Sequence, residues 1–310
     1  METRRLGRSG PEVSVLGLGT WAMGGDEWGP SDDQRSIEVL RAAVEQGITL
    51  IDTADVYGLG HSEELIAEAV PAHASVRIVT KAGWDIYTDP PVVGGARRRY
   101  DAEYLEHALE KSLFRLRRAA VDVFLLHNPD ATDLAASDLA ATLRRFKARG
   151  RARWVGASVG SQEDATAAIA AGLDVVMLPF NAVRSWARDV LVPAAAAGVG
   201  LVGREPFERG LLTGRYGPDA RFAAGDHRAA KGEAWLAGAQ PAAARVRAVA
   251  ERRGITMPEV ALGYPLSHGA LGSVVAGARS VEQLTANVAA AATRLTDDEL
   301  ADISEDRPPS

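Results

Sequence analysis

The chain has 310 residues, of which 46% are hydrophobic and 25% are charged, and these proportions are typical of ordinary globular proteins. It contains no cysteine, which excludes disulfides, thiolate nucleophiles and cysteine-ligated metal sites, so any redox chemistry must use a bound cofactor. The formal charge of -6 comes from basic and acidic residues mixed along the chain, which argues against nucleic acid or an anionic membrane as a partner. The first residues lack an apolar signal core, and no run of about 18 apolar residues could cross a bilayer, so we expect a soluble cytoplasmic protein.

Short apolar or β-branched runs alternate along the chain with longer stretches of helical spacing. Several of these runs are almost continuously apolar, which is typical of parallel strands that are covered on both faces. Eight runs are predicted to be strands: Val13–Gly19, Ile48–Ala54, Val76–Lys81, Val121–His127, Arg153–Ser158, Val175–Phe180, Gly200–Arg204 and Ser273–Ala278.

The stretches between these strands carry signals for the starts and ends of helices. A hydroxyl side chain placed three residues before a side chain that can bond back predicts a helix start. A glycine that can adopt a left-handed conformation predicts a helix end. The predicted N-caps are Ser31, Ser161, Thr256 and Ser280, and the predicted glycine ends are Gly47, Gly150, Gly172, Gly198 and Gly254.

The alternation of eight strands with helices predicts an α/β fold, a closed (β/α)8 TIM barrel with an N-terminal strand or hairpin. An open doubly wound sheet is the alternative. No composition shift or Pro/Ser-rich linker divides the chain, so we expect residues 1–310 to form a single domain. Trp84–Tyr100 after the third strand and Gly214–Gly238 after the seventh are too long for simple connections and are candidates for a lid.

Polar side chains stand at or just after the ends of three consecutive predicted strands, where a parallel barrel carries its chemistry. Asp52, Lys81 and His127 occupy the strand ends, and Tyr57 follows Asp52 by five residues. Each has an ordinary structural explanation, such as an Asp52–Lys81 ion pair, a loop aromatic or a hydrogen-bonded strand end. Together they could move a proton, because a cation beside a tyrosine lowers the pKa of its hydroxyl. We therefore expect a site for carbonyl reduction, or alcohol oxidation in reverse, with the hydride coming from a cofactor.

Spaced motifs along essentially the whole chain carry a resemblance to a known family. They are Leu16-Gly-Leu-Gly-Thr-Trp21, Asp52-Thr-Ala-Asp-Val-Tyr-Gly58, Ser62-Glu63, Thr80-Lys81, Leu125-Leu-His127, Gly156-Ala-Ser158, Gly210-Leu-Leu-Thr-Gly214 and Gly277-Ala-Arg-Ser280. The sequence resembles the aldo-keto reductases, and the resemblance implies a TIM barrel and a nicotinamide cofactor bound in extended form without a Rossmann domain. It also implies a catalytic tetrad of Asp52, Tyr57, Lys81 and His127. In that tetrad Tyr57 is the general acid/base, Lys81 lowers its pKa with help from Asp52, and His127 orients the substrate carbonyl.

The segment after the last predicted strand is a candidate phosphate site. Ser280 opens a helix whose first N–H groups can bind an anion, and Arg279 can pair with a phosphate. The resemblance assigns this segment to the adenosine 2′-phosphate and so favours NADP(H) over NAD(H), whereas an N-cap beside a surface arginine is the structural alternative. The candidate cofactor contacts are Thr20, Trp21, Asp52, Ser158, Arg204, Glu205, Pro206, Phe207, Arg215, Gly277, Arg279, Gln283 and Asn287.

Three places depart from the family pattern. Val159 stands where the family usually has Asn or Arg, and Met177 stands where it usually has Gln, so two expected amide contacts are absent. The segment Arg204–Phe207, Arg-Glu-Pro-Phe, replaces the common aromatic-Ser-Pro-Leu and removes the ring expected against the nicotinamide. Arg204 and Glu205 could pair with each other, contact the cofactor or bind a polar substrate, and the sequence does not choose.

Other functions have weaker support. Gly17-Leu-Gly19 resembles part of a dinucleotide-binding fingerprint, but no helix opens directly at the turn. Asp52, His127 and Asp130 stand near strand ends, but no metal-ligand spacing accompanies them, so a metal-dependent hydrolase is disfavoured and no metal site is expected. A cofactor-binding regulatory or partner subunit with little turnover is the remaining alternative. The expected partner is a small carbonyl or sugar substrate, and the oligomeric state stays open.

Overall fold

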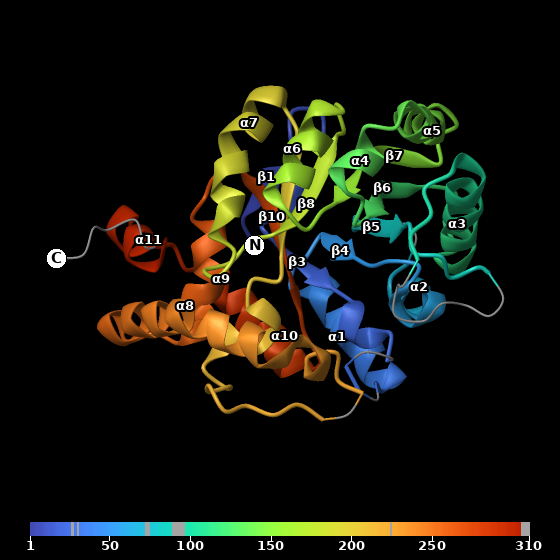
Figure 1. Cartoon of the computed structure of the whole chain (residues 1–310). Coiled ribbons are helices and arrows are strands. Elements are labelled where there is room, and N and C mark those ends of the chain that lie inside the picture. The colour runs from blue at the N-terminus through green and yellow to red at the C-terminus, as the bar shows by residue number, and fades with distance from the viewer. Residues whose placement is uncertain (26–27, 30, 72–74, 89–96, 224, 305–310) are drawn as a thin grey trace.

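The computed structural model describes residues 1–25, 28–29, 31–71, 75–88, 97–223 and 225–304 and contains eight parallel strands that close into a barrel (Figure 1). Consecutive strands pair around the barrel, and the last strand pairs with the first. The predicted TIM barrel is confirmed, and the open doubly wound sheet is excluded because the sheet has no free edge. The barrel strands are β3 (Leu16–Gly19), β4 (Leu50–Asp52), β5 (Arg77–Ala82), β6 (Val121–His127), β7 (Ala152–Ser158), β8 (Val175–Pro179), β9 (Gly200–Arg204) and β10 (Leu271–Gly277).

A small antiparallel hairpin precedes the barrel, formed by β1 (Thr3–Arg5) and β2 (Glu12–Ser14). The prediction of one strand over Val13–Gly19 is therefore wrong. Its first two residues belong to β2, in which Val13 faces Arg4 of β1, and the chain leaves the hairpin at Val15 before β3 begins. The run is mostly apolar because both pieces are buried, although they pair with different partners. The other seven predicted strands overlap β4 to β10 and differ from them only at their ends.

Apolar side chains that point inward fill the barrel, and the hairpin closes its amino-terminal end. Gly200 and Gly272, at the starts of β9 and β10, lie so close to Leu6 that an added Cβ would come within 2.8 Å and 2.9 Å of its side chain. Burying each large side chain here stabilises the fold by about 1.5–3 kcal/mol. The interior cluster consists of Leu6, Val13, Leu50, Val79, Val123, Leu125, Val175, Met177, Val202 and Val275.

Helices surround the barrel, and several of their predicted boundaries are confirmed. Ser161, Thr256 and Ser280 cap helices as predicted, and the five predicted glycine ends all have φ between 64° and 83°. Ser31 was the wrong cap, because the carboxylate of Asp32 accepts the hydrogen bond from the Arg35 N–H instead. None of the described helices is long and apolar enough to span a membrane. The helices are α1 (Asp33–Glu45), α2 (His61–Ala69), α3 (Ala102–Arg115), α4 (Ala131–Leu134), α5 (Ser137–Ala148), α6 (Gln162–Ala170), α7 (Leu191–Ala197), α8 (Gly232–Arg253), α9 (Met257–Leu266), α10 (Val281–Ala290) and α11 (Asp297–Ser304), with short 3-10 turns η1 (Trp21–Met23), η2 (Tyr57–Gly60), η3 (Ser185–Val190), η4 (Glu208–Thr213) and η5 (Ala229–Lys231).

The two long additions follow β5 and β9. The first includes residues 89–96, which lie outside the described part of the chain. The second is shorter than predicted, because α8 begins at Gly232 and so contains the last residues of the predicted addition. Within it, Asp226 forms an isolated antiparallel bridge with Trp28 of the loop after β3. Two loops that are far apart in the sequence therefore meet above the carboxyl ends of the barrel strands.

Candidate active site

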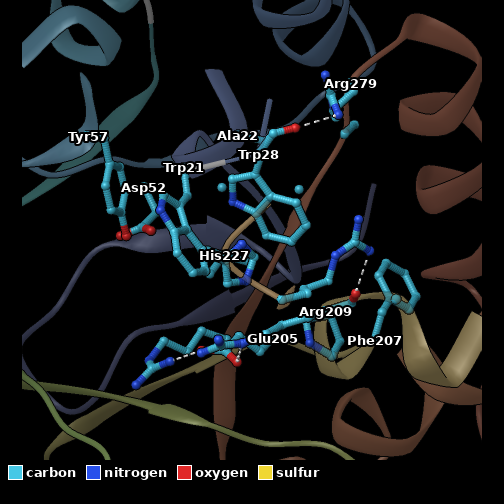
Figure 2. A pocket seen from close by; sticks show the side chains of 18 of the residues that line it. Trp21, Ala22, Trp28, Asp52, Tyr57, Glu205, Phe207, Arg209, His227 and Arg279 are labelled. Carbon is cyan, nitrogen blue, oxygen red and sulfur yellow. Dashed lines mark hydrogen bonds and ion pairs between the residues drawn. The ribbon is translucent and has the colours of Figure 1, made fainter. Parts of the chain in front are cut away.

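The four residues predicted as a tetrad meet at the carboxyl ends of β4, β5 and β6. Lys81 is 1% exposed, and its Nζ lies 2.7 Å from Asp52 Oδ1 and 2.6 Å from the carbonyl oxygen of Thr53. The same Nζ lies 3.4 Å from the Tyr57 hydroxyl oxygen, and the rings of Tyr57 and His127 stand edge to face with centroids 6.0 Å apart. Asp52 and Tyr57 point to the same part of the pocket in Figure 2. The structure thus places one buried ammonium between a carboxylate and a phenol.

Burial sets the protonation of these groups. Burial lowers the pKa of Lys81, and the charge of the Asp52 carboxylate opposes this shift. Burial also raises the pKa of Asp52, and the charge of Lys81 opposes that shift. The pKa of His127 lies well below its usual value because the ring is buried and faces the charges of Lys81 and Arg204. His127 is therefore a neutral imidazole near pH 7, which can donate a hydrogen bond through one ring nitrogen.

Tight packing between two loops aims Tyr57 at this site. After Asp52 the chain turns through Gly58 and Leu59, both with positive φ, and Gly58 packs directly on Gly24. A Cβ added to Gly58 would lie 2.5 Å from the Gly24 carbonyl oxygen, so neither position has room for a side chain. Below this turn the Asp55 N–H donates to the Lys81 carbonyl oxygen at 3.0 Å. The loop that carries Tyr57 is thereby fixed to the strand that carries Lys81.

Thr20 supports the site from behind. Its side chain is fully buried, and its hydroxyl donates to the Asp52 carbonyl oxygen at 3.0 Å and accepts from Ser62 Oγ at 2.7 Å. Thr20 is not among the described residues that line the pocket, unlike the other candidate cofactor residues. Its geometry is that of a residue that holds the end of β4.

A cavity of about 1000 Å³ opens above the tetrad. Twelve of the predicted cofactor residues line it: Trp21, Asp52, Ser158, Arg204, Glu205, Pro206, Phe207, Arg215, Gly277, Arg279, Gln283 and Asn287. Of the residues that the structure describes, seven Lys or Arg side chains line it against two Asp or Glu, although the whole chain has a formal charge of -6. The cavity is therefore suited to a long, multiply anionic ligand. Among the described residues, no cluster of three or more His, Asp or Glu side chains could hold a metal ion.

Aromatic side chains form the wall of the cavity beside the tetrad. Trp21 stacks on Tyr57 with ring centroids 6.2 Å apart, and His227 packs against both Trp21 and Trp28 at 4.6 Å and 4.3 Å (Figure 2). The rings of Trp84 and His127 stand edge to face, with centroids 6.2 Å apart. Sequence reasoning predicted Arg215 of this loop but missed His227, Arg228 and Lys231, which also line the cavity. Their one signal in the sequence is their position in the long addition after β9, because contacts such as the bridge between Trp28 and Asp226 are not visible in the sequence.

Arg204 and Glu205, which the sequence left open, pair with each other at the end of β9. Arg204 Nη1 forms an ion pair with Glu205 Oε1, and Nη2 donates to the Val159 carbonyl oxygen at 3.1 Å. Glu205 Oε2 accepts from Arg209 Nε at 3.1 Å, a contact in the region that Figure 2 shows. Burial alone would raise the pKa of Glu205, but the two guanidinium groups lower it to about 2. Glu205 is thus ionised at neutral pH.

The end of β10 combines a helix start with an arginine. Ser280 caps α10, and the Arg279 N–H donates to Gln283 Oε1 at 2.8 Å. Arg279 Nη1 donates to the Trp28 carbonyl oxygen at 3.1 Å, and Asn287 Nδ2 donates to the Gly277 carbonyl oxygen at 3.2 Å. The side chains at this end of the cavity offer both a cation and hydrogen-bonding groups to a ligand.

Comparison with known proteins finds relatives that match most of the chain. The sequence profile of the Aldo/keto reductase family matches residues 15–306. The chain is 33% identical over 233 residues to Aldo-keto reductase YhdN of Bacillus subtilis (strain 168), covering 74% of this chain and 69% of that protein. It is 28% identical over 312 residues to a protein of the same organism described as Uncharacterized oxidoreductase YqkF, covering 97% and 94% of the two chains.

Solved structures show the same fold. Glycerol dehydrogenase AKR11B4 from Gluconobacter oxydans superimposes with a TM-score of 0.80 at 28% identity, covering 98% of this chain and 94% of that one. The holo form of aldo-keto reductase AKR11C1 from Bacillus halodurans gives a TM-score of 0.80 at 24% identity, covering 98% and 96%. Because the family profile matches nearly the whole chain, this protein belongs to the aldo-keto reductase family, whose members are oxidoreductases that act on carbonyl compounds and generally use nicotinamide cofactors.

Proposed function

We propose that this protein is an NADP(H)-dependent oxidoreductase that acts on an aldehyde, a ketone or a sugar carbonyl, or on the corresponding alcohol. The observation that carries the proposal is the position of Lys81 Nζ, which contacts the Asp52 carboxylate and the Tyr57 hydroxyl at the floor of a cation-lined cavity. The bound nicotinamide would supply or accept the hydride.

In this proposal the tetrad handles the proton and orients the carbonyl. Tyr57 donates its hydroxyl proton to the carbonyl oxygen as negative charge develops there, and Lys81 stabilises the phenolate that remains. Asp52 keeps Lys81 in place and opposes the loss of its charge. The neutral ring of His127 donates a hydrogen bond to the same carbonyl oxygen and orients it without protonating it. In alcohol oxidation the phenolate of Tyr57 takes the proton back.

The residues around the cavity fit NADP(H). Arg279 at the start of α10 would hold the 2′-phosphate, with Gln283 and Asn287 near the adenine and Arg215 near the other phosphates. Ser158, which pairs with His127 across β6 and β7 and lines the cavity, would contact the nicotinamide. The excess of basic side chains supports a cofactor with a third phosphate over NAD(H).

Fluorescence titration of the purified protein with NADPH and NADH, followed by a panel of aldehydes, sugars and polyols, tests this function. Polyols belong in the panel because a structural relative is described as a glycerol dehydrogenase. We expect tighter binding of NADPH and measurable turnover. Binding without turnover of any carbonyl or alcohol would favour a regulatory or partner subunit, and the absence of binding would refute the proposed cofactor.

A further inference from the structure

The strand ends on the β7 to β9 side of the cavity offer few groups that can bind an amide. Val159 and Met177 are fully buried and apolar, and no residue of β8 lines the cavity among the described residues. Ser158 is the only lining residue of β7. The nicotinamide of the proposed cofactor carries a carboxamide, whose oxygen needs a donor once it leaves water. On this side of the cavity that donor has to come from Ser158 or from the end of β9.

Arg204 has donors to spare at this place. A guanidinium has five N–H groups, and the contacts with Glu205 and the Val159 carbonyl oxygen occupy two of them. The Arg204 Nε atom is buried and has no hydrogen-bond acceptor among the described residues. The side chain lines the cavity and is 21% exposed. A buried N–H without an acceptor is unfavourable, so a ligand atom that accepts from this guanidinium gains free energy.

The charge of Arg204 is partly compensated by Glu205. Its carboxylate partner, Glu205, is shared with Arg209 and stays ionised, so an anionic group that approached Arg204 would also face Glu205. Glu205 has a φ of 56°, an unfavourable conformation for a residue with a side chain, and such strain persists only where surrounding contacts hold it. With the ionised Glu205 carboxylate beside it, the Arg204 guanidinium suits an uncharged carbonyl oxygen better than a second carboxylate.

Arg204 is also close to the reacting groups. It lines the same cavity as Asp52, Lys81 and His127, and its charge affects the pKa values of all three. Hydride transfer requires the nicotinamide ring to touch the carbonyl carbon held by Tyr57 and His127. A nicotinamide bound there would occupy the cavity that Arg204 also lines.

We propose that Arg204 positions the nicotinamide by donating a hydrogen bond to its carboxamide oxygen, with Glu205 and the Val159 carbonyl oxygen holding the guanidinium in place. This inference rests on the proposed use of NADP(H). It assigns to an ion pair at the end of β9 the contact that Val159 and Met177 cannot provide.

Binding measurements on the purified protein test this role without any turnover. Calorimetric titration compares NADPH with adenosine 2′,5′-bisphosphate, which carries the 2′-phosphate but no nicotinamide. We expect Arg204→Met to weaken NADPH binding about tenfold, the factor for a hydrogen bond worth about 1.4 kcal/mol, and to change bisphosphate binding less than about twofold. Arg279→Met is the matched control at the other end of the cavity, and it should weaken both ligands.

A cofactor analogue gives a second readout. In the thionicotinamide analogue of NADP the carboxamide oxygen is replaced by sulfur, a weaker acceptor. Wild-type protein should bind NADP several-fold more tightly than this analogue, and Arg204→Met should remove most of that preference. Arg204→Lys keeps the charge but not the planar group, so it should also lose much of the preference. This second variant, checked by thermal melting, tests the role even if Arg204→Met does not fold.

Three outcomes would overturn the inference. Unchanged NADPH binding in folded Arg204→Met would show that the carboxamide does not need this side chain. Equal weakening of both ligands would show that Arg204 acts through the general shape or potential of the cavity. Unchanged NADPH binding together with a raised KM for an oxo acid would show that Arg204 binds substrate. If wild-type protein binds the bisphosphate but neither NADPH nor NADH, the proposed function itself fails.

Discussion

The substitution Lys81→Met isolates the buried ion pair at the centre of the site. Methionine keeps most of the apolar stem of lysine and so leaves little cavity, but it removes the ammonium that lies 2.7 Å from Asp52 Oδ1. The side chains of Lys81 and Asp52 are 1% and 7% exposed, so the remaining carboxylate has almost no access to water. The variant therefore reports the free energy of leaving one charge buried without its partner.

The structure gives the size and the pH dependence of the effect. Removing one partner of a buried pair costs about 3–5 kcal/mol of unfolding free energy. Arg204 also attracts the Asp52 carboxylate, so we expect the lower part of this range, about 3–4 kcal/mol near pH 8. Burial raises the pKa of Asp52 above its unfolded value, and Lys81 no longer opposes that shift in the variant. A raised carboxyl pKa costs stability as the pH rises, so the deficit should shrink by up to about 1.4 kcal/mol per pH unit as the pH falls between the folded and unfolded pKa values.

Urea unfolding at about pH 8 and about pH 5 measures the loss of unfolding free energy and its change with pH. The double variant Lys81→Met/Asp52→Asn is the control. The double variant has no buried charge at the pair, so it should recover at least about half of the lost stability near pH 8. It should not recover turnover, because no cation remains beside Tyr57. Equal unfolding free energies for the single and double variants near pH 8 would refute the reasoning, since the loss would then not come from an unpaired carboxylate.

Three further predictions follow from the same geometry. Tyr57→Phe should lower kcat by about 10²–10⁴-fold with NADPH affinity near wild type, and retained turnover in stopped-flow assays would contradict its proton-donor role. Because the pKa of His127 lies well below its usual value, the ring stays neutral as the pH falls, and kcat/KM for reduction should show no titration near pH 6.5, the usual histidine value, in a pH–rate profile. Gly58→Ala, at φ 61° and 2.5 Å from the Gly24 carbonyl oxygen, should lower the unfolding free energy by about 2 kcal/mol or more, as judged by urea unfolding. Gly254→Ala, at φ 64° with open space around it, is the matched control and should lower the unfolding free energy by only about 1 kcal/mol. Equal decreases for the two variants would argue against the contact between Gly58 and Gly24.

Local patterns predicted the barrel because each strand and most helix ends are specified by nearby residues. An apolar run that is buried on both faces, such as Val121–His127, needs no knowledge of its neighbours to be recognised as a parallel strand. The prediction of one strand over Val13–Gly19 is wrong because local hydrophobicity does not show which strands a segment pairs with. The first part of this run pairs with β1, and the second part pairs with β4 and β10. Ser31 and Asp32 are both good caps, and only the backbone conformation of the folded chain selects Asp32.

The candidate site was predictable to the extent that strand ends define it. Asp52, Lys81 and His127 close neighbouring strands, so the topology alone brings them together. The bridge between Trp28 and Asp226 joins loops nearly 200 residues apart in the sequence, and no local sequence pattern predicts it. Glu205, which pairs with Arg204, has a positive φ, and sequence patterns do not predict such a conformation for a residue other than glycine.

The closure of the barrel also determines when this protein can finish folding during its synthesis. β3 pairs on one side with β4, but on the other side only with β10, where the Val274 N–H donates to the Val15 carbonyl oxygen at 2.8 Å. Arg4 of the hairpin likewise donates to the carbonyl oxygens of Leu266 and Leu271. Until β10 leaves the ribosome, β3 and β9 each present an unpaired edge that could join another chain. The sheet therefore stays open until β10 is made, and β10 decides whether the sheet closes on itself or pairs with another chain.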